Sequence, residues 1–144
     1  MVKTATAALP CKHLSVSIPQ PFERVNAFLS DPANWTLWAS GLGEMQFDAA
    51  RDVWTAQQDG VGVVTIVFTP PNAFGILDHR VTLPDGSVVI MPVRAMANGD
   101  STELVLTLFR QPGMDDATWK RDEEWVKKDL ERLKKIIGAT ECPR

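Results

Sequence analysis

The 144-residue chain contains no tyrosine, only two cysteines and only two histidines, His13 and His79. No cysteine or histidine pair has zinc-ligand spacing, so a metal site built from this chain is not expected. The sequence also lacks the Gly-Lys-Ser/Thr loop that cradles phosphates and the Gly-x-Ser-x-Gly turn of a nucleophilic serine. We therefore expect no metal and no cofactor, and whether the protein is an enzyme stays open.

Clustered positive charge and long apolar runs are absent as well. Fifteen Lys and Arg stand against 18 Asp and Glu, and the net charge is −3 with the two signs interspersed. A binder of the phosphate backbone needs a clustered basic face, so we expect no nucleic-acid partner. No segment approaches the ~20 apolar residues of a membrane helix, and residues 1–9 lack the apolar core of a signal peptide. We therefore expect a cytoplasmic protein without integral membrane association, in which Cys11 and Cys142 are free thiols.

The first third of the chain predicts one strand followed by two short helices. Residues 13–18 alternate apolar and polar side chains, as a half-buried strand does. Pro21 suits the first turn of the first helix. Asp31 can cap the second helix, with Pro32 in its first position.

From residue 44 onward the hydrophobic period is two, which predicts six further strands. Turn residues such as Asp59-Gly60 and Asn98-Gly99 separate the strands by short links, so an antiparallel arrangement is expected. Pro92 lies inside one strand and indicates an edge position or a bulge there. The expected strands are 44–49, 53–58, 61–69, 75–83, 87–97 and 102–110.

The last element is a long amphipathic helix. Asp115 or Asp116 can cap it, and it should run to about Ile137, with Gly138 as its C-terminal stop. Its apolar stripe consists of Trp119, Val126, Leu130, Leu133 and Ile137. The chain has no repeat and no linker, so we expect a single domain over 1–144 with an ordered core of about 12–138.

The order of these elements predicts an α+β helix-grip fold. A seven-strand antiparallel sheet is expected to twist and curl. Two short helices follow its first strand, and the long C-terminal helix lies over its concave face. One helix cannot fill a wide curved sheet, so the remaining space is either packed with large side chains or left as a pocket.

This arrangement resembles the START-like, or Bet v 1-like (SRPBCC), superfamily, and in particular its bacterial polyketide cyclase/dehydrase branch. The resemblance spans about 12–138. The stretches that carry it are 21–25 (PFERV), 31–35 (DPANW), 77–79 (LDH), 83–86 (LPDG), 109–114 (FRQPGM) and 129–134 (DLERLK). It implies a cavity between sheet and helix that takes apolar molecules, and it implies no shared catalytic motif.

The function expected first is binding of an apolar or aromatic small molecule in that cavity, in a carrier or sequestering role. Two alternatives stay open. One is an enzyme of cyclase, dehydratase or isomerase type that uses the same cavity for proton transfer. The other is a protein-interaction domain that uses the convex face of the sheet.

Two ionisable residues are candidates for such a cavity. His79 belongs to the apolar alternation of its strand and should face inward, where it could orient a ligand carbonyl or act as a base, or else be a satisfied core histidine. Asp122 lies within the apolar stripe of the long helix, where it is either desolvated or at the edge of the stripe. Asp129 continues the same line, and a local pairing with Arg132 would explain it.

The remaining candidates are basic and apolar. Arg94 could hold a carboxylate if it faces inward, or it could lie outward at a sheet edge. Trp35, Trp38 and Trp119 are expected near the opening of the sheet, as core packing or as a pocket wall. Val126 accompanies them on the helix stripe.

Strand 61–69 is apolar on both faces. Val61, Val63 and Val67 lie on one face, and Val64, Ile66 and Phe68 lie on the other. Such a strand is typical of a sheet covered on both sides, which favours a homodimer. A dimer contact through Val64, Ile66 and Phe68 would favour the interaction-domain alternative only if the cavity were filled.

Overall fold

A computed structural model describes residues 7–139, which form eight strands, two α-helices and a short 3₁₀ helix. Cys142 therefore lies outside the described residues. In chain order the elements are β1 Cys11–Ile18, α1 Phe22–Leu29, η1 Pro32–Leu37, β2 Gln46–Asp48, β3 Val53–Gln58, β4 Gly62–Phe68, β5 His79–Thr82, β6 Val88–Met91, β7 Val93–Asn98, β8 Ser101–Phe109 and α2 Asp116–Gly138. Among these residues no helix is both long and apolar enough to span a bilayer.

The helix boundaries follow from side-chain caps. Asp31 accepts a hydrogen bond from Ala33 N at 3.0 Å, and Pro32 occupies the first position of η1. Asp115, not Asp116, caps α2 by accepting from Thr118 N at 2.8 Å. Gly138 is the last residue of the helix rather than a stop after it, because the C-cap is Ala139 in a right-handed conformation.

The strands form two antiparallel sheets, so the expected single seven-strand sheet is wrong. One sheet has three strands in the order β1-β8-β7, and the other has five in the order β2-β3-β4-β5-β6. The division falls at Pro92, where the expected strand 87–97 is split into β6 and β7. Proline has no N–H to give to a ladder, so pairing stops at that residue.

The expected strand 75–83, which lies beside β6 and β7, is also interrupted. Gly75 has a φ of +72°, and a Cβ there would lie 2.2 Å from Ala95 O, so the chain needs glycine to pass this close. The carbonyl oxygen of Gly75 accepts a hydrogen bond from Ala95 N at 2.9 Å. The expected strand 75–83 is therefore reduced to β5, with a single bridge between Ile76 and Arg94 before it.

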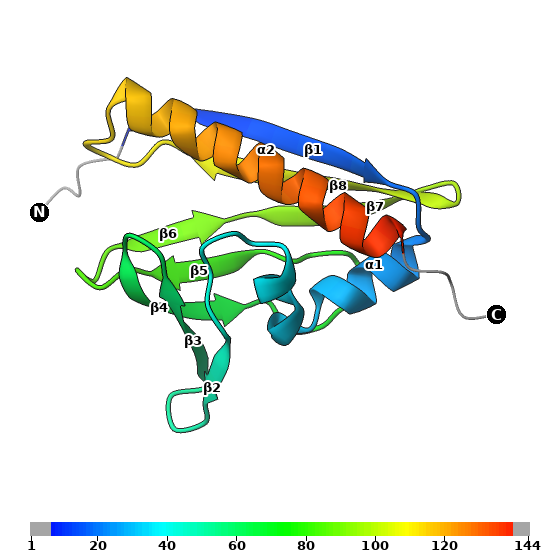
Figure 1. The fold of residues 1–144 in the computed structure, drawn as a ribbon, viewed down its shortest axis with the longest axis horizontal. Helices are drawn as coiled ribbons and strands as arrows, with labels where there is room; N and C mark the ends of the chain where they lie inside the picture. Colours follow the sequence, from blue (N-terminus) through cyan, green and yellow to red (C-terminus); the bar gives the residue numbers. More distant parts are fainter. Residues whose placement is uncertain (1–6, 140–144) are drawn as a thin grey trace, which may run out of the picture.

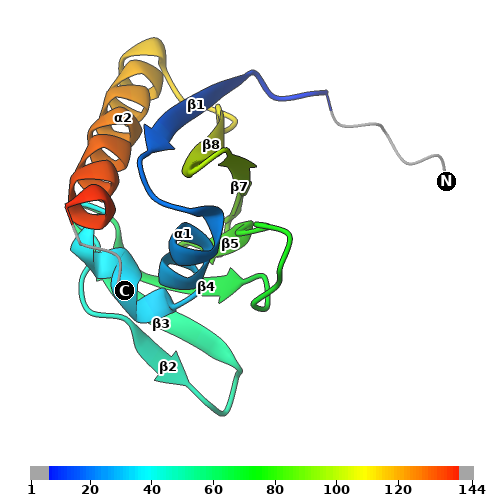
Figure 2. The same ribbon diagram turned by 90° about the vertical axis from the view of Figure 1, so that its right-hand side faces the viewer.

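The helix-grip arrangement itself is present. Figure 1 shows α2 lying along β1 and β8, with the five-stranded sheet on the other side of the molecule. Seen from the end in Figure 2, the two sheets curve around an interior that α1 closes at one end. β1 and β8 pair over their full lengths, from Cys11 opposite Phe109 to Ile18 opposite Thr102.

The core consists of two clusters of buried side chains. The larger lies between α2, α1, η1 and the three-stranded sheet, and Leu133 and Leu104 are fully buried in it. The smaller, between β2, β3 and β4, contains Met45, Ala56, Val64 and Ile66. Leu42 and Phe68 are only partly buried, and both pack against the two clusters.

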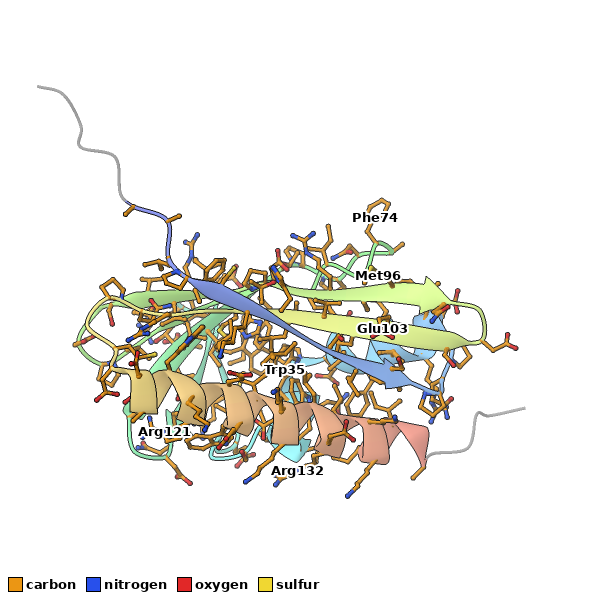
Figure 3. All side chains as sticks on the ribbon, turned by 90° about the horizontal axis from the view of Figure 1, so that it is seen from above. Trp35, Phe74, Met96, Glu103, Arg121 and Arg132 are labelled. Atoms are coloured by element: carbon orange, nitrogen blue, oxygen red, sulfur yellow. The ribbon has the colours of Figure 1, made fainter. Side chains whose placement is uncertain are left out.

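The outer face of the five-stranded sheet is apolar, but the residues named for a subunit contact do not lie on it. Val64 and Ile66 are buried and Phe68 is half-buried on the inner side, so these three residues do not form an exposed surface for a subunit contact. The alternation of the strand instead exposes Val61, Val63 and Val67. Figure 3 shows two further exposed apolar side chains, Phe74 and Met96, on the side of the molecule away from α2.

Candidate functional site

The inner side of the five-stranded sheet is apolar but incompletely covered. The antiparallel register aligns Trp54 with Ile66, and Phe68 with His79. We call five half-buried residues on this side the inner face: Trp54, Phe68, His79, Val81 and Met91. Val89, opposite Val81, is half-buried beside them. Val64 and Ile66 beside them are buried, so solvent reaches one part of a surface that is otherwise core.

An aromatic cluster joins the inner face to the interior. Trp35 in η1 and Trp38, which directly follows η1, lie three residues apart, and their rings pack at 4.8 Å between centroids. Trp35 also contacts Phe68 of β4 at 5.2 Å and His79 of β5 at 4.7 Å. Figure 3 places Trp35 between α2 and the strands. Two elements distant in sequence, η1 and β4, therefore pack aromatic rings against the imidazole that β5 carries.

The surroundings of His79 keep its ring neutral. Desolvation by burial lowers its pKa from 6.5 to about 4, although the Leu77 carbonyl and the Asp78 carboxylate act in the opposite direction. Nδ1 lies 3.2 Å from Leu77 O, and among residues 7–139 no side chain or backbone group forms a hydrogen bond with Nε2. The inward orientation expected from the alternation is present, while a role in binding stays a prediction.

Trp35 and Trp38 differ in the partners of their indole N–H groups. Trp35 Nε1 donates to Leu29 O at 2.9 Å, which ties η1 to the end of α1. Trp38 is 3% exposed, and its Nε1 has no acceptor in the described part of the chain. Both rings belong to the larger core cluster, so core packing accounts for most of their surface.

Asp122 is not joined to His79. Its side chain is 30% exposed and lies 3.6 Å from the guanidinium of Arg121, which places it at the edge of the helix stripe. Among residues 7–139, no hydrogen bond or ion pair links Asp122 with the histidine. The structure therefore does not bring these two candidates together.

Asp129 has a partner that the sequence did not indicate. Its Oδ1 accepts from the Ser40 hydroxyl at 2.7 Å and from Ser40 N at 3.2 Å, so the expected local pairing with Arg132 is not its main contact. Desolvation raises the pKa of Asp129 above its usual value despite these hydrogen bonds. The indole of Trp125 donates to the same hydroxyl. This network links α2 to the segment that follows η1.

Arg94 lies on the outer surface. Its guanidinium forms two hydrogen bonds with Asp78, from Nε at 2.9 Å and from Nη2 at 2.8 Å, and its side chain is 53% exposed. The hydrogen bonds from Arg94 hold the pKa of Asp78 below its usual value. Of the two alternatives for Arg94, the structure shows the outward one, away from the inner face.

A hollow lies between β1 and α2. It is an open groove of about 690 Å³, and its lining mixes charged and apolar side chains: Lys12, His13, Leu14, Ser15, Glu123, Lys127, Leu130 and Glu131. Lys12 and Lys127 both pair with Glu123, and Glu131 adds a second carboxylate to the lining, so neither sign of charge is in excess there. Trp119 is buried beside the groove, and Lys12 Nζ lies 5.2 Å from the centroid of the Trp119 ring. Val126 is half-buried and packs against the larger core cluster.

Several solved structures share this fold. Ara h 8.0201 matches with a TM-score of 0.70 and 10% identity over 92% of this chain and 100% of that one. A conserved protein from Geobacillus kaustophilus matches with a TM-score of 0.68 and 13% identity over 90% and 96% of the two chains. DynU16, from the dynemicin biosynthetic locus, matches with a TM-score of 0.63 and 19% identity over 88% of this chain but 46% of its own.

These likenesses identify the fold as Bet v 1-like, or START-like, as the sequence resemblance predicted. No protein-family model and no curated protein matches the sequence. Identities of this size establish the fold alone, so the polyketide cyclase/dehydrase branch stays a prediction.

Proposed function

We propose that the protein binds an apolar or aromatic small molecule against the inner face, between the five-stranded sheet and α2, in a carrier or sequestering role. The observation that carries the proposal is the half-buried state of the inner face. Trp54, Phe68, Val81 and Met91 are large apolar side chains on the side of the sheet that faces the core, yet solvent still reaches them. A ligand that covers them would remove apolar surface from water, at about 25 cal/mol per Å².

The chemistry of the inner face supports an uncharged occupant. None of its five residues carries a charge at neutral pH, because His79 is neutral there. The nearby carboxylate of Asp78 binds Arg94 on the outer surface and does not serve the inner face. Flat aromatic ligands suit a wall that already contains Trp35 and Phe68.

The alternative of a cyclase, dehydratase or isomerase lacks the contact that would have favoured it. Proton transfer by His79 and Asp122 requires both groups within hydrogen-bond reach of one substrate. Asp122 instead contacts Arg121 at the helix surface. Binding is therefore the function that the geometry supports best.

Two adjacent residues of β6 provide a matched test of the proposal. Met91 lies on the inner face, whereas Ile90 is 45% exposed on the outer face. We expect the neutral fluorescent probe N-phenyl-1-naphthylamine to bind the wild-type protein at micromolar concentration, with energy transfer from tryptophan. Met91→Trp should fill the space over the inner face and weaken binding about tenfold, or about 1.4 kcal/mol. Ile90→Trp should leave the affinity unchanged. Absence of binding, or equal loss in both variants when both retain the wild-type circular dichroism spectrum, would contradict the proposal.

A further inference from the structure

The contact between His79 and Leu77 determines which ring nitrogen carries the proton. Nδ1 lies 3.2 Å from the carbonyl oxygen of Leu77. A carbonyl oxygen can only accept, so Nδ1 must be the donor in this hydrogen bond. The neutral imidazole has a single N–H, and Nε2 is therefore left with a lone pair, as an acceptor.

This acceptor has no partner within the protein. No donor lies within hydrogen-bond distance of Nε2 among the described residues, and the ring packs against Trp35 and Phe68 instead. Nε2 is not fully buried, so solvent can donate to it in the unliganded protein, whereas an apolar ligand that covers the ring would leave it without a donor. A bound molecule with a hydroxyl or N–H group would satisfy it.

A ligand group that can only accept hydrogen bonds is disfavoured beside Nε2. A ligand oxygen that can only accept would face the Nε2 lone pair, and a carboxylate would add a charge in an apolar setting. Protonation of His79 would allow it to donate from Nε2, but burial opposes that charge at neutral pH. The inner face thus distinguishes ligands by what they donate rather than by apolar area alone.

We propose that His79 is a specificity-determining residue whose Nε2 accepts a hydrogen bond from the bound ligand, so that the site selects neutral aromatic molecules carrying a hydroxyl or N–H donor. The inference rests on the proposed function, because it assigns a ligand class to the same inner face. It goes beyond that function in naming the atom that recognises the ligand and the group that the ligand must carry.

Two probes of nearly equal shape test the inference. 2-Naphthol carries a donor, and 2-methoxynaphthalene has the same rings with the donor capped. We expect the wild-type protein to bind 2-naphthol about 3- to 10-fold more tightly at pH 7, the range that one hydrogen bond contributes. His79→Phe keeps an aromatic ring without the acceptor, so it should bind both probes equally. His79→Gln restores an acceptor and should recover part of the preference.

The outcomes separate this inference from the proposed function. Equal binding of the two probes by the wild-type protein, or an unchanged preference in His79→Phe, would overturn the role of Nε2 and leave binding intact. Absence of binding by both probes would overturn the proposed function and the inference with it.

A measurement on the wild-type protein keeps the inference falsifiable even if His79→Phe does not fold. Long-range ¹H–¹⁵N correlation spectra distinguish the two tautomers of a neutral imidazole. We expect the proton of His79 on Nδ1 at pH 7. A proton on Nε2 would overturn the inference whatever the probes do.

Discussion

At the scale of single residues, His79 is the ionisable group most altered by its surroundings. Its ring contacts Trp35 edge-on and lies 5.4 Å from Phe68, so little water can solvate a positive charge there. In the unfolded chain the same imidazole is solvated and titrates near 6.5. The difference between the two states makes folding depend on pH.

We expect the free energy of unfolding to fall on acidification because of His79. The folded-state pKa is about 4 and the ordinary value is 6.5, so between these pH values the unfolded chain binds more protons. This contribution to stability is complete above pH 6.5 and is lost as the pH falls toward about 4. A loss of about 3 kcal/mol is the upper limit, at 1.36 kcal/mol per pKa unit. Urea unfolding from pH 7 to pH 4.5 measures it.

Carboxylates also titrate in this range, so the acid-induced loss of stability in the wild-type protein is compared with the loss in His79→Phe. The wild-type protein should lose more stability on acidification than the variant, because only the wild-type imidazole becomes protonated on unfolding. Parallel profiles for the two proteins would show that the ring is solvated when folded.

The sequence could predict the direction in which His79 faces but not what it contacts. Alternation along a strand is a local property, and Leu77, His79 and Val81 display it directly. The pairing of Ser40 with Asp129 joins residues 89 apart in the chain. The helical pattern predicted only the local partner Arg132 for Asp129, whereas the structure pairs Asp129 with Ser40.

At the scale of elements, α2 follows its sequence pattern closely. The expected apolar stripe is present, with Leu130, Leu133 and Ile137 buried at 2%, 0% and 2% exposure. Lys127 lies on the flank of the helix, beside the groove between β1 and α2, where it pairs with Glu123 at 3.0 Å while its side chain stays 57% exposed. Figure 3 shows Arg121 and Arg132 extending from the helix on the side away from the strands.

Substitutions on the two sides of α2 should therefore have unequal effects. Leu133→Ala removes a fully buried side chain from the contact between helix and sheet, so we expect a loss of about 2–5 kcal/mol in the free energy of unfolding. Lys127→Ala removes an exposed ion pair and should cost less than about 1 kcal/mol. Equal losses in urea melts would mean that the assigned faces of α2 are wrong.

The division of the sheet was harder to predict than the helix. The sequence indicated a disturbance at Pro92 but not its consequence for the neighbouring strand. In the structure, Asp78 accepts from Val93 N at 2.9 Å and so satisfies a buried N–H immediately after the proline. The same carboxylate binds Arg94, which explains why this arginine lies outside. Such compensation depends on two segments meeting in space, which periodicity does not describe.

At the scale of the whole molecule, the two faces of the five-stranded sheet present different surfaces. The inner face is apolar, half-buried and bordered by aromatic rings. The outer face exposes Val61, Val63 and Val67 to solvent at 46%, 58% and 47%. A homodimer through the outer face stays a prediction, whereas the inner face is the basis of the proposed function.

The order of elements was enough to predict the helix-grip fold, because short links force sequential strands to pair and the long helix must cover an apolar face. The location of the incompletely covered surface was not predictable in this way. It depends on how far α2 extends over the five-stranded sheet and on which side chains close the two core clusters. Leu42 and Phe68, which pack against both clusters, could be identified only from the structure.

The central claim is that a small apolar ligand binds at the inner face. Methyl NMR spectra of the protein saturated with 2-naphthol test it most directly, through nuclear Overhauser effects between ligand protons and assigned methyl groups. We expect contacts to Val81 and Met91 on the inner face and none to Val67 and Ile90, which lie on the outer face of the same sheet. Contacts confined to Val67 and Ile90, or no contacts at a saturating concentration, would contradict the account.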